Sequence, residues 1–249
     1  MVSHAPPDFI WLLAHRIRWQ LIRALTASDY RVQELVDFLG KPANLVSYHL
    51  KLLRKHALVQ AHRSEADGRD IYYSLDLDRL QNGYLDAGRV IHPALGGGVS
   101  GEQRREVGAG RRLRVLFLCT SNSARSQMAE GLMRETGGEQ VDVYSAGGQP
   151  APVHPLAIAT LKEIGIDIGE AAAKHIHIFD GHEFDYAITV CDRMREACPT
   201  YLACHANIHW SIADPVRIED PFEQKAAFER TARELSQRIQ YWLEWVNRE

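Results

Sequence analysis

The stretch LRVLFLCTSNSARSQMAEGLM, residues 113–133, is the most informative part of the chain. Its first six residues, 113–118, form a short β-rich run that is typical of a buried strand. Residues 124–136 are expected to form a helix, so the chain turns from strand to helix in between. A Cys-x5-Arg-Ser motif stands at that turn and runs from Cys119 through Arg125 to Ser126.

The residues of this turn are suited to hold an anion. The backbone N–H groups of such a loop and the N-terminus of the next helix converge on one point and favour negative charge there. This field favours the thiolate of Cys119. Arg125 offers two parallel donors to a tetrahedral oxyanion, Ser126 can donate to the thiolate, and Asn122 tolerates a left-handed backbone. We therefore expect a nucleophilic cysteine, not merely a packed thiol. The expected oxyanion-binding loop consists of Thr120, Ser121, Asn122, Ser123 and Ala124.

Strands and helices alternate through the rest of this half. Further strands are expected at residues 141–145, 185–190 and 207–210, and further helices at residues 155–165 and 221–246. Such alternation predicts an α/β domain with a central four-stranded parallel sheet. One apolar stripe of the last helix is expected to pack on that sheet. It consists of Phe228, Ala232, Leu235, Ile239, Trp242 and Val246.

A glycine-rich segment separates this half from the residues before it. Residues 92–112 contain six glycines and show no apolar periodicity, so we expect a flexible linker. The charge also changes across it. Residues 1–112 carry 16 Lys and Arg against 12 Asp and Glu, whereas residues 113–249 carry 13 against 20. We therefore predict two domains with different partners, residues 1–91 and residues 113–249.

The composition argues against several classes of protein. The 249 residues contain no run of 18 or more apolar residues, so no membrane span is expected. The N-terminus lacks the basic-then-apolar pattern of a signal peptide, so export is not expected. Four cysteines, all after the linker, do not make a disulfide scaffold. A cytoplasmic protein with free thiols fits these observations.

The residues before the linker have the pattern of a small α+β domain. Helices are expected at residues 9–25, 31–39 and 44–57, and the second is closed by Gly40-Lys41-Pro42. Residues 58–62 and 71–75 alternate like strands and are joined around Asp67-Gly68, a strong hairpin signal. A last helix is expected at residues 76–91. Two short helices followed by a hairpin constitute the winged form of the helix-turn-helix.

The third of these helices has a polar face suited to nucleic acid. Side chains that can donate to base edges and phosphates line it at steps of three and four. They are Asn44, Ser47, Tyr48, Lys51 and Lys55. Arg63 and Arg69 flank the hairpin tip, where a wing can contact the minor groove or the backbone. On an isolated helix such a stripe would more simply be a solvated face. The flanking turn and hairpin favour DNA binding, because the docking geometry needs all three parts.

Two segments of this domain carry a family resemblance. LVSYHLKLLRKHALV, residues 45–59, and GRDIYYSLD, residues 68–76, resemble the ArsR-type family of metal- and metalloid-responsive repressors. The resemblance implies operator DNA as a partner and a homodimer formed through this domain. Members that sense trivalent arsenic often carry a Cys-x-Cys pair on the first helix of the helix-turn-helix. Here that segment reads RVQELVDFLG, so the domain senses through another site or does not sense metalloid by itself.

The second half resembles a different family. Residues 115–133 are similar to the active-site loop of low-molecular-weight tyrosine phosphatases and of arsenate reductases with the same fold. The resemblance continues through YSAGGQP at 144–150, HPLAIATLKEIGIDI at 154–168 and ITVCD at 188–192. It ends around HWSIADPV at 209–216. In this family an Asp-Pro late in the chain supplies the general acid, and the resemblance implies that role for Asp214.

Three features favour the reductases over the phosphatases. Thioredoxin-coupled arsenate reductases use three cysteines in relay, and Cys191 and Cys198 are spaced Cys-x6-Cys after a predicted strand. Phosphatases of this fold usually carry tyrosines after the Asp-Pro, where this chain has Val216-Arg217. The segment QMAEG after the loop is the version found in reductases.

The resemblance implies a sequence of thiol reactions. Cys119 attacks arsenate, Cys191 then attacks Cys119 and releases arsenite, and Cys198 resolves the disulfide for an external reductant. That reductant is thioredoxin or a low-molecular-weight thiol. By residue type alone, Cys191 and Cys198 would instead be buried structural thiols, which is the commonest fate of a free cysteine.

No bound cofactor or metal is expected. Some reductases of this family hold potassium beside the loop through residues equivalent to Asn122, Glu130 and Ser145 and through an acidic residue. This chain has Lys174 at the acidic position. An ammonium group there would replace the ion, so no potassium requirement is expected.

Together the two resemblances suggest an arsenic-resistance protein. A DNA-binding transcriptional regulator precedes a domain that reduces arsenate to arsenite with a thioredoxin-like partner. Two alternatives stay open. The second domain is a non-catalytic sensor in which Cys191, Cys198 and Cys204 bind arsenite, or it is a low-molecular-weight tyrosine phosphatase.

Overall fold

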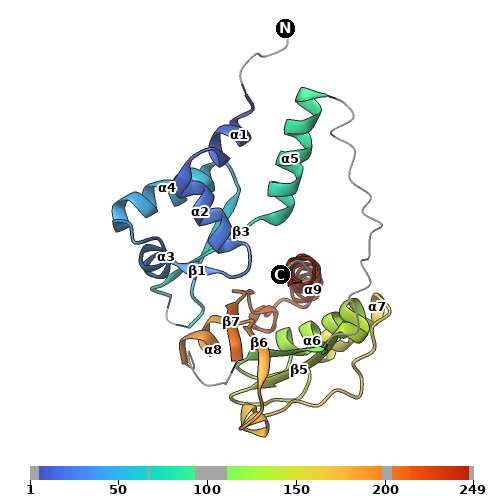
Figure 1. Cartoon of the computed structure of the whole chain (residues 1–249). Coiled ribbons are helices and arrows are strands. Elements are labelled where there is room, and N and C mark those ends of the chain that lie inside the picture. The colour runs from blue at the N-terminus through green and yellow to red at the C-terminus, as the bar shows by residue number, and fades with distance from the viewer. Residues whose placement is uncertain (1–5, 67, 93–110, 198–203, 247–249) are drawn as a thin grey trace. The chain divides into compact units, whose positions relative to one another are not determined.

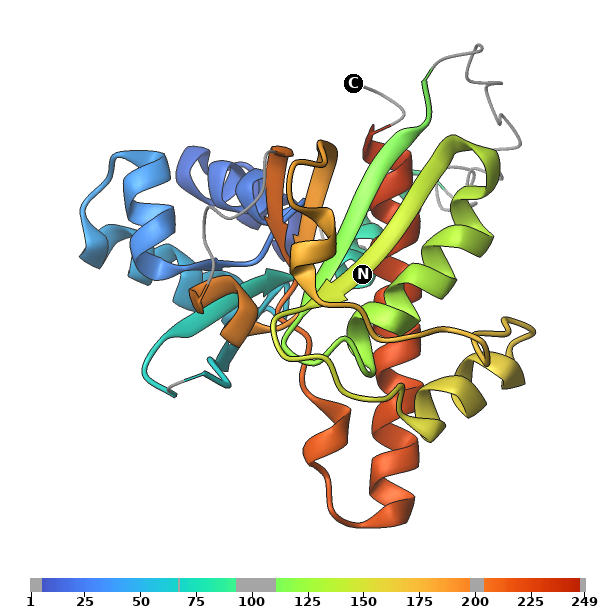
Figure 2. The ribbon, with the colours of Figure 1, turned by 90° about the horizontal axis from the view of Figure 1, so that it is seen from below.

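The apolar run that begins at Leu113 forms the central strand of a parallel sheet. In the computed structural model, which describes residues 6–66, 68–92, 111–197 and 204–246, this strand is β4 (Leu113–Cys119; Figure 1). Its neighbours are β5 (Val141–Gly147), β6 (Phe184–Thr189) and β7 (Cys204–His209). The strand order is β5-β4-β6-β7, and every pair is parallel. Figure 2 shows the four strands side by side. The predicted four-stranded parallel sheet is confirmed.

Helices follow the strands of this unit in the expected order. They are α6 (Arg125–Gly137), α7 (Pro155–Glu163), α8 (Asp192–Ala197) and α9 (Pro221–Val246). Among the described residues, the short 3-10 helices η2 (Gly138–Gln140), η3 (Ile176–Phe179) and η4 (Pro215–Arg217) lie between them. Helix α6 packs on β4 and β5 and against both α7 and α9.

The core of this unit lies between the sheet and the apolar stripe of α9. Phe228, Leu235 and Ile239 have no exposed surface, and Trp242 is buried against Tyr186 of β6 with ring centroids 4.9 Å apart. Burying a large apolar side chain contributes about 1.5–3 kcal/mol. The stripe therefore stabilises the sheet, as predicted from its spacing.

The residues before the linker form a second compact unit. Its elements are α1 (Asp8–Leu13), α2 (Arg16–Leu25), β1 (Tyr30–Arg31), α3 (Val32–Leu39), α4 (Ala43–Lys55), β2 (Val59–Arg63), β3 (Ile71–Leu75) and α5 (Leu77–Ile91). The three strands form an antiparallel sheet in the order β1-β3-β2. Strand β1 was not predicted, because it is only two residues long. The α3–α4 pair and the β2–β3 hairpin lie where the sequence predicted them.

The predicted single helix at residues 9–25 is wrong, because the chain breaks between α1 and α2. His15 has an extended backbone and caps α2, since its Nδ1 accepts a hydrogen bond from the N–H of Ile17. Arg18 is buried and donates to the last carbonyls of α1, those of Leu12 (2.6 Å) and Trp11 (2.8 Å). These polar groups satisfy the helix ends that a break would otherwise leave unpaired.

Left-handed glycines mark both predicted turns of this unit. Gly40 closes α3 with φ +58°, and its N–H bonds to the carbonyl of Val36. Gly68 follows the hairpin tip with φ +72°. Glycine adopts this conformation without the steric cost that a Cβ imposes.

Most of the predicted linker, residues 93–110, lies outside the described residues. Within the part of the chain that the structure describes, no helix is both long and apolar enough to cross a membrane.

Candidate active site

The predicted site residues meet at one edge of the parallel sheet. The register pairs Cys119, the last residue of β4, with Gly147, the last residue of β5. It also pairs Leu118 with Thr189 at the end of β6. The carboxyl ends of parallel strands are the usual place for a site in such a sheet. Cys119 ends β4, Cys191 follows the end of β6, and Asp214 follows the end of β7.

The loop after Cys119 is held with its carbonyl groups pointing away from the site. The carbonyls of Thr120, Ser121 and Ser123 accept hydrogen bonds from the N–H groups of Gln149 (2.8 Å), Ala151 (3.0 Å) and His154 (2.9 Å). Each bond turns a peptide so that its own N–H points to the opposite side. The loop N–H groups are thereby available to an anion.

Two donors lie next to the sulfur of Cys119. The N–H of Asn122 points at Cys119 Sγ at 3.2 Å, and Ser126 Oγ lies 2.9 Å from the same atom. Ser126 already accepts a bond from Asn122 Nδ2 (2.9 Å), so its own proton is free for the sulfur. Hydrogen bonds to the charged form favour that form. This geometry stabilises a Cys119 thiolate.

The side chain of Asn122 connects the loop to the segments around it by hydrogen bonds. It is fully buried, with φ +46°, the left-handed backbone expected from the sequence. Its amide makes four hydrogen bonds. Nδ2 donates to Ser126 and to Ser145 (2.8 Å), and Oδ1 accepts from Gln127 Nε2 (3.0 Å) and from the N–H of Lys174 (2.7 Å). A buried amide whose donors and acceptors all have hydrogen-bond partners can have only one orientation.

Arg125 and Asp214 form an ion pair at this edge. Arg125 Nη2 lies 2.9 Å from Asp214 Oδ2, and Nη1 donates to the carbonyl of Ile212 at 2.8 Å. Burial lowers the pKa of Arg125, but the charges of neighbouring acidic groups such as Asp214 outweigh that effect and raise it. The guanidinium is therefore a fixed positive charge beside the loop.

Cys191 lies against the loop. It is fully buried, two residues beyond β6, and its Sγ lies 3.4 Å from Thr120 Oγ1 and 3.4 Å from the N–H of Met194. Burial raises the pKa of Cys191 to about 11, with a contribution from the charge of Cys119 and opposition from Arg125. At neutral pH this residue is a thiol held next to the loop that follows Cys119.

A buried polar cluster anchors the segment that carries Cys191. Asp192 Oδ1 accepts bonds from His209 Nε2 (3.1 Å) and from the hydroxyl of Ser211, and Thr189 Oγ1 contacts His209 Nδ1 at 2.8 Å. Burial acts to raise the pKa of Asp192, but the bonds from His209 and Ser211 prevail and lower it. A negative charge is thus fixed at the start of α8, where the helix dipole favours it.

Of the other two cysteines, the structure describes only Cys204. Cys198 lies outside the described residues. Cys204, at the start of β7, is half-buried, and burial raises its pKa.

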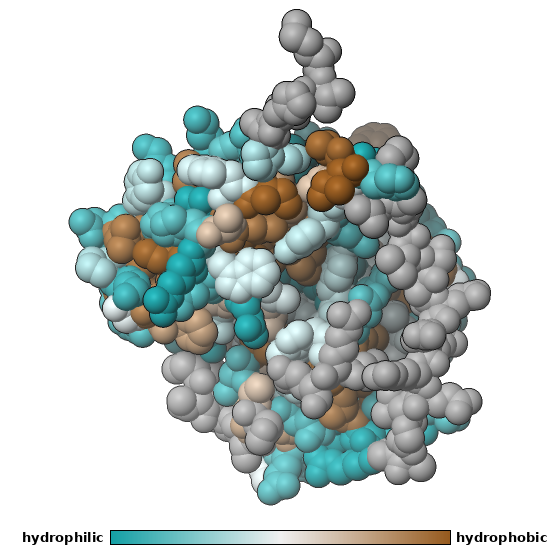
Figure 3. Space-filling model, turned by 45° about the horizontal axis from the view of Figure 1, so that its top comes forward, coloured by the Kyte–Doolittle hydropathy of each residue, from teal (hydrophilic) through white to brown (hydrophobic). Residues whose placement is uncertain are grey.

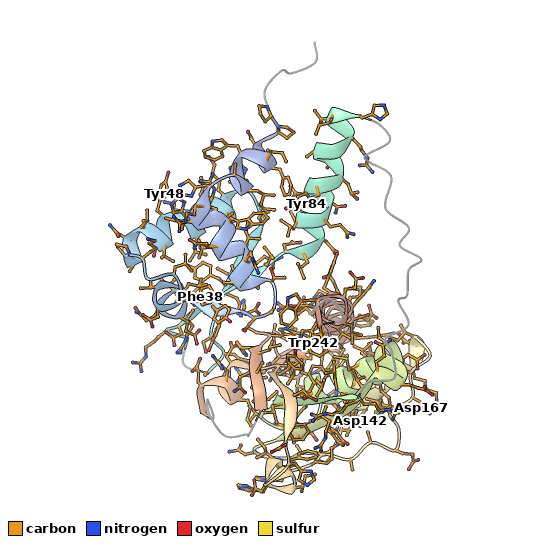
Figure 4. All side chains as sticks on the ribbon, in the orientation of Figure 1. Phe38, Tyr48, Tyr84, Asp142, Asp167 and Trp242 are labelled. Atoms are coloured by element: carbon orange, nitrogen blue, oxygen red, sulfur yellow. The ribbon has the colours of Figure 1, made fainter. Side chains whose placement is uncertain are left out.

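The candidate DNA-binding side chains of the first unit lie on its surface. Helix α4 buries Val46, Leu50 and Leu53 completely. Its other face is exposed, and Tyr48 on that face is labelled in Figure 4. The predicted residues that are exposed on α4 and beside the hairpin tip are Asn44, Ser47, Tyr48, Lys51, Lys55, Arg63 and Arg69.

Gly147 and Gln127 support the loop, although no sequence pattern predicted these roles. A Cβ added at Gly147 would lie 2.7 Å from the backbone N of Asn122 and 2.7 Å from the carbonyl oxygen of Thr120. Gln127 ties Asn122 to the carbonyl of Ala172. Both roles depend on contacts with distant residues, which no local motif reveals. Among the described residues, no three His, Cys, Asp or Glu side chains are grouped so as to hold a metal ion.

Known proteins match the second unit. Residues 114–249 match the family of low molecular weight phosphotyrosine protein phosphatases. The chain is 39% identical over 131 residues to the arsenate reductase of Halalkalibacterium halodurans, across 52% of this chain and 94% of the relative. It is 37% identical to the arsenate reductase of Bacillus licheniformis over the same shares of each chain.

A solved structure of an arsenate reductase in the phosphate-binding state is 31% identical, with a TM-score of 0.44 over 51% of this chain and 94% of that one. With its Cys-x5-Arg-Ser loop at the end of β4 and the match over residues 114–249, the chain belongs to the low molecular weight phosphotyrosine protein phosphatase family.

Proposed function

We propose that the second unit is an arsenate reductase that converts arsenate to arsenite. The observation that carries this proposal is the position of Cys191, a buried thiol 3.4 Å from Thr120 of the nucleophile's loop. A phosphatase needs one cysteine at this site, whereas a thiol relay needs a second within reach of the first. The similarity to curated arsenate reductases supports the same function.

The first step forms a bond between sulfur and arsenic. The Cys119 thiolate attacks the arsenic of arsenate, and an As–O bond breaks. The oxygen leaves as water after it takes a proton from Asp214, which lies 2.9 Å from Arg125 beside the loop. Arg125 and the loop N–H groups stabilise the negative charge of the remaining oxygens.

The next steps move two electrons from sulfur to arsenic. The Cys191 thiolate attacks Cys119 Sγ, an S–S bond forms, and the S–As bond breaks with its electron pair on arsenic, which leaves as arsenite. Cys198 then attacks Cys191 and releases the Cys119 thiolate. An external dithiol of the thioredoxin class, or a low-molecular-weight thiol, reduces the Cys191–Cys198 disulfide by thiol exchange.

A tyrosine phosphatase is the second candidate, because the chain belongs to that family. The site lacks aromatic walls after Asp214, where Val216 and Arg217 stand. The test is hydrolysis of a chromogenic aryl phosphate by the wild type and by Cys119→Ser. Rapid Cys119-dependent release of phosphate, without consumption of arsenate in the presence of reductant, would contradict the reductase function and favour the phosphatase.

We infer that the first unit is an ArsR-type winged helix that binds operator DNA and regulates transcription. The exposed donors of α4 support this, since Lys51 and Lys55 accompany three neutral donors on one face. The left-handed Gly40 between α3 and α4 and the β2–β3 hairpin supply the turn and the wing that such docking needs. A gel-retardation assay with the gene's own upstream DNA at low salt tests this function. Absence of retardation would contradict it.

The same unit is proposed to form a homodimer. Large apolar side chains are exposed on α1 and α5, among them Trp11 (56% exposed), Tyr84 (47%) and Ile91 (77%). Hydrophobic patches appear in the upper part of Figure 3, which looks onto the region of these two helices. Patches of this kind often mark protein–protein contacts. A mass of one chain in solution at micromolar concentration would contradict the dimer.

Arsenite sensing by the second unit is the remaining alternative. In that case Cys191, Cys198 and Cys204 would bind arsenite and change the affinity for DNA without turnover. Retardation of DNA with and without arsenite, repeated with Cys191→Ser, separates sensing from catalysis. A response to arsenite in a protein that cannot reduce arsenate would favour the sensor.

A further inference from the structure

A nearly buried carboxylate lies behind the nucleophile's loop. Glu130, on α6, has a side chain that is 11% exposed, and two cations contact it. Arg134 Nη2 lies 2.5 Å from Oε1, and Lys174 Nζ lies 3.2 Å from Oε2. A buried charge is strongly destabilising once its partner is removed, so at least one of these cations is required.

The two cations differ in what else they touch. Arg134 is one helical turn from Glu130, and its side chain is 61% exposed. Lys174 is less exposed, at 28%, and belongs to the segment that follows α7. Its backbone N–H donates to Asn122 Oδ1 at 2.7 Å, and its carbonyl accepts from the N–H of Gly147 at 2.9 Å. Of these two cations, Lys174 is the one that connects the Glu130 carboxylate to the loop, through its backbone bond to Asn122.

A chain of hydrogen bonds leads from this carboxylate to the nucleophile. Glu130 Oε2 accepts the proton of Ser145 Oγ (2.5 Å), so the lone pairs of Ser145 are left to accept from Asn122 Nδ2 (2.8 Å). Asn122 then donates its other Nδ2 proton to Ser126, so the hydroxyl proton of Ser126 is left to donate to Cys119 Sγ, 2.9 Å away. The direction of every bond in this chain depends on Glu130 being a carboxylate that only accepts.

We propose that Lys174 is a positioning residue for the Cys119 thiolate. Its backbone N–H fixes the oxygen end of the Asn122 amide. Its ammonium group pairs with Glu130 and holds it in place, so that Ser145 holds the nitrogen end of the same amide. The Ser126 proton is thereby directed at Cys119 Sγ. The proposal deepens the proposed reductase function and rests on it only where turnover is measured.

The direct test measures the reactivity of Cys119 without arsenate. Cys191→Ser, Cys198→Ser and Cys204→Ser together leave Cys119 as the only cysteine of the full chain. The rate of its alkylation by iodoacetamide is followed from pH 5 to pH 9 in this background. Lys174→Met is compared with Arg134→Met, a matched control that removes the other cation from the same carboxylate. Melting temperatures establish that each variant is folded.

Lys174→Met is expected to move the midpoint of the alkylation profile upward by about one pH unit, the size of shift that one lost charge-assisted interaction produces. Arg134→Met is expected to leave the midpoint in place. Lys174→Arg keeps a cation and should restore most of the shift. Glu130→Gln combined with Lys174→Met removes both charges and should lie between the parent and Lys174→Met.

A second readout is turnover by the chain with all four cysteines. Lys174→Met should lower kcat/KM for arsenate about tenfold, as expected for loss of a bond to a charged group, while Arg134→Met leaves it unchanged. Equal shifts of the alkylation profile in both variants, or no shift in Lys174→Met, would overturn the proposal. If the wild type shows no turnover, the proposed reductase function is contradicted. The alkylation result still tests the role of Lys174 in that case.

Discussion

The sulfur of Cys191 lies 3.4 Å from Oγ1 of Thr120, the residue that follows the proposed nucleophile Cys119 in the chain. This contact exists because β4 and β6 are adjacent and parallel, with Leu118 paired to Thr189. The two cysteines therefore leave the sheet at the same edge although 71 positions separate Thr120 from Cys191. The proposed reductase activity rests on this second thiol beside the loop.

The disulfide-forming step is expected to accelerate with pH. Burial raises the pKa of Cys191 to about 11, so below that pH the attacking group is mostly a neutral thiol. Its thiolate fraction, and with it the rate of Cys119–Cys191 bond formation, should rise about tenfold for each pH unit between 6 and 9. Single-turnover experiments with arsenate and Cys198→Ser, quenched by acid, measure this rate. A profile that is flat over this range would mean that Cys191 is already ionised.

Gly147→Ala is expected to disrupt the oxyanion loop. The new Cβ would lie 2.7 Å from backbone atoms of both Asn122 and Thr120, and neither can move without breaking the loop's hydrogen bonds. Such overpacking destabilises a fold by about 1–3 kcal/mol. Arsenate reduction should fall below detection, while Gly148→Ala, whose Cβ meets only Met194 Sδ at 4.0 Å, should stay active. Full activity of Gly147→Ala in a reductase assay would show that the loop tolerates the shift.

Asp214→Asn is expected to slow chemistry without weakening binding. Loss of the proposed general acid should lower the rate of adduct formation by at least about 10²-fold. Because Asp214 pairs with Arg125 at 2.9 Å, its neutralisation leaves the guanidinium more available to the oxyanion. Affinity for arsenate, measured by protection of Cys119 from alkylation, should not decrease. Asp180→Asn, a change to an exposed carboxylate, serves as the control. A variant that binds weakly but reacts at the normal rate would contradict the assigned role.

Lys51→Ala is expected to weaken operator binding and to reduce its salt dependence. Lys51 is exposed on the polar face of α4. Removing one phosphate contact should lower the slope of log affinity against log salt by about one. Arg23→Ala removes the same charge from the exposed surface of α2 and should have little effect. Equal losses in the two variants, measured by fluorescence anisotropy, would indicate attraction by net charge rather than by the α4 face.

Local sequence was enough to predict the parts of the site that are close in the chain. The strand, the loop from Cys119 to Ser126 and the start of α6 are contiguous, so their chemistry could be read directly. The four-stranded sheet followed from the alternation of apolar runs with helical patterns. The helix that begins at Pro221 was predicted with its correct bounds, because its apolar stripe is regular from Phe228 to Val246.

The remaining features depend on contacts between distant residues. The break after Leu13 requires Arg18 to fold back onto the carbonyls of Leu12 and Trp11, whereas the apolar pattern alone continues through it. Gly147 has no room for a side chain because β5 ends against the loop of β4. The double contact of Lys174, through its backbone to Asn122 and through its ammonium to Glu130, depends on where the segment after α7 runs.

The most direct measurement is arsenite production from arsenate with thioredoxin, thioredoxin reductase and NADPH. Wild type is compared with Cys191→Ser, Cys198→Ser and the matched control Cys204→Ser, whose half-buried sulfur lies outside the proposed relay. The three-cysteine mechanism predicts turnover in wild type and Cys204→Ser and its collapse in the other two variants. No turnover in wild type, or normal turnover in Cys191→Ser, would contradict a reductase that works by this relay.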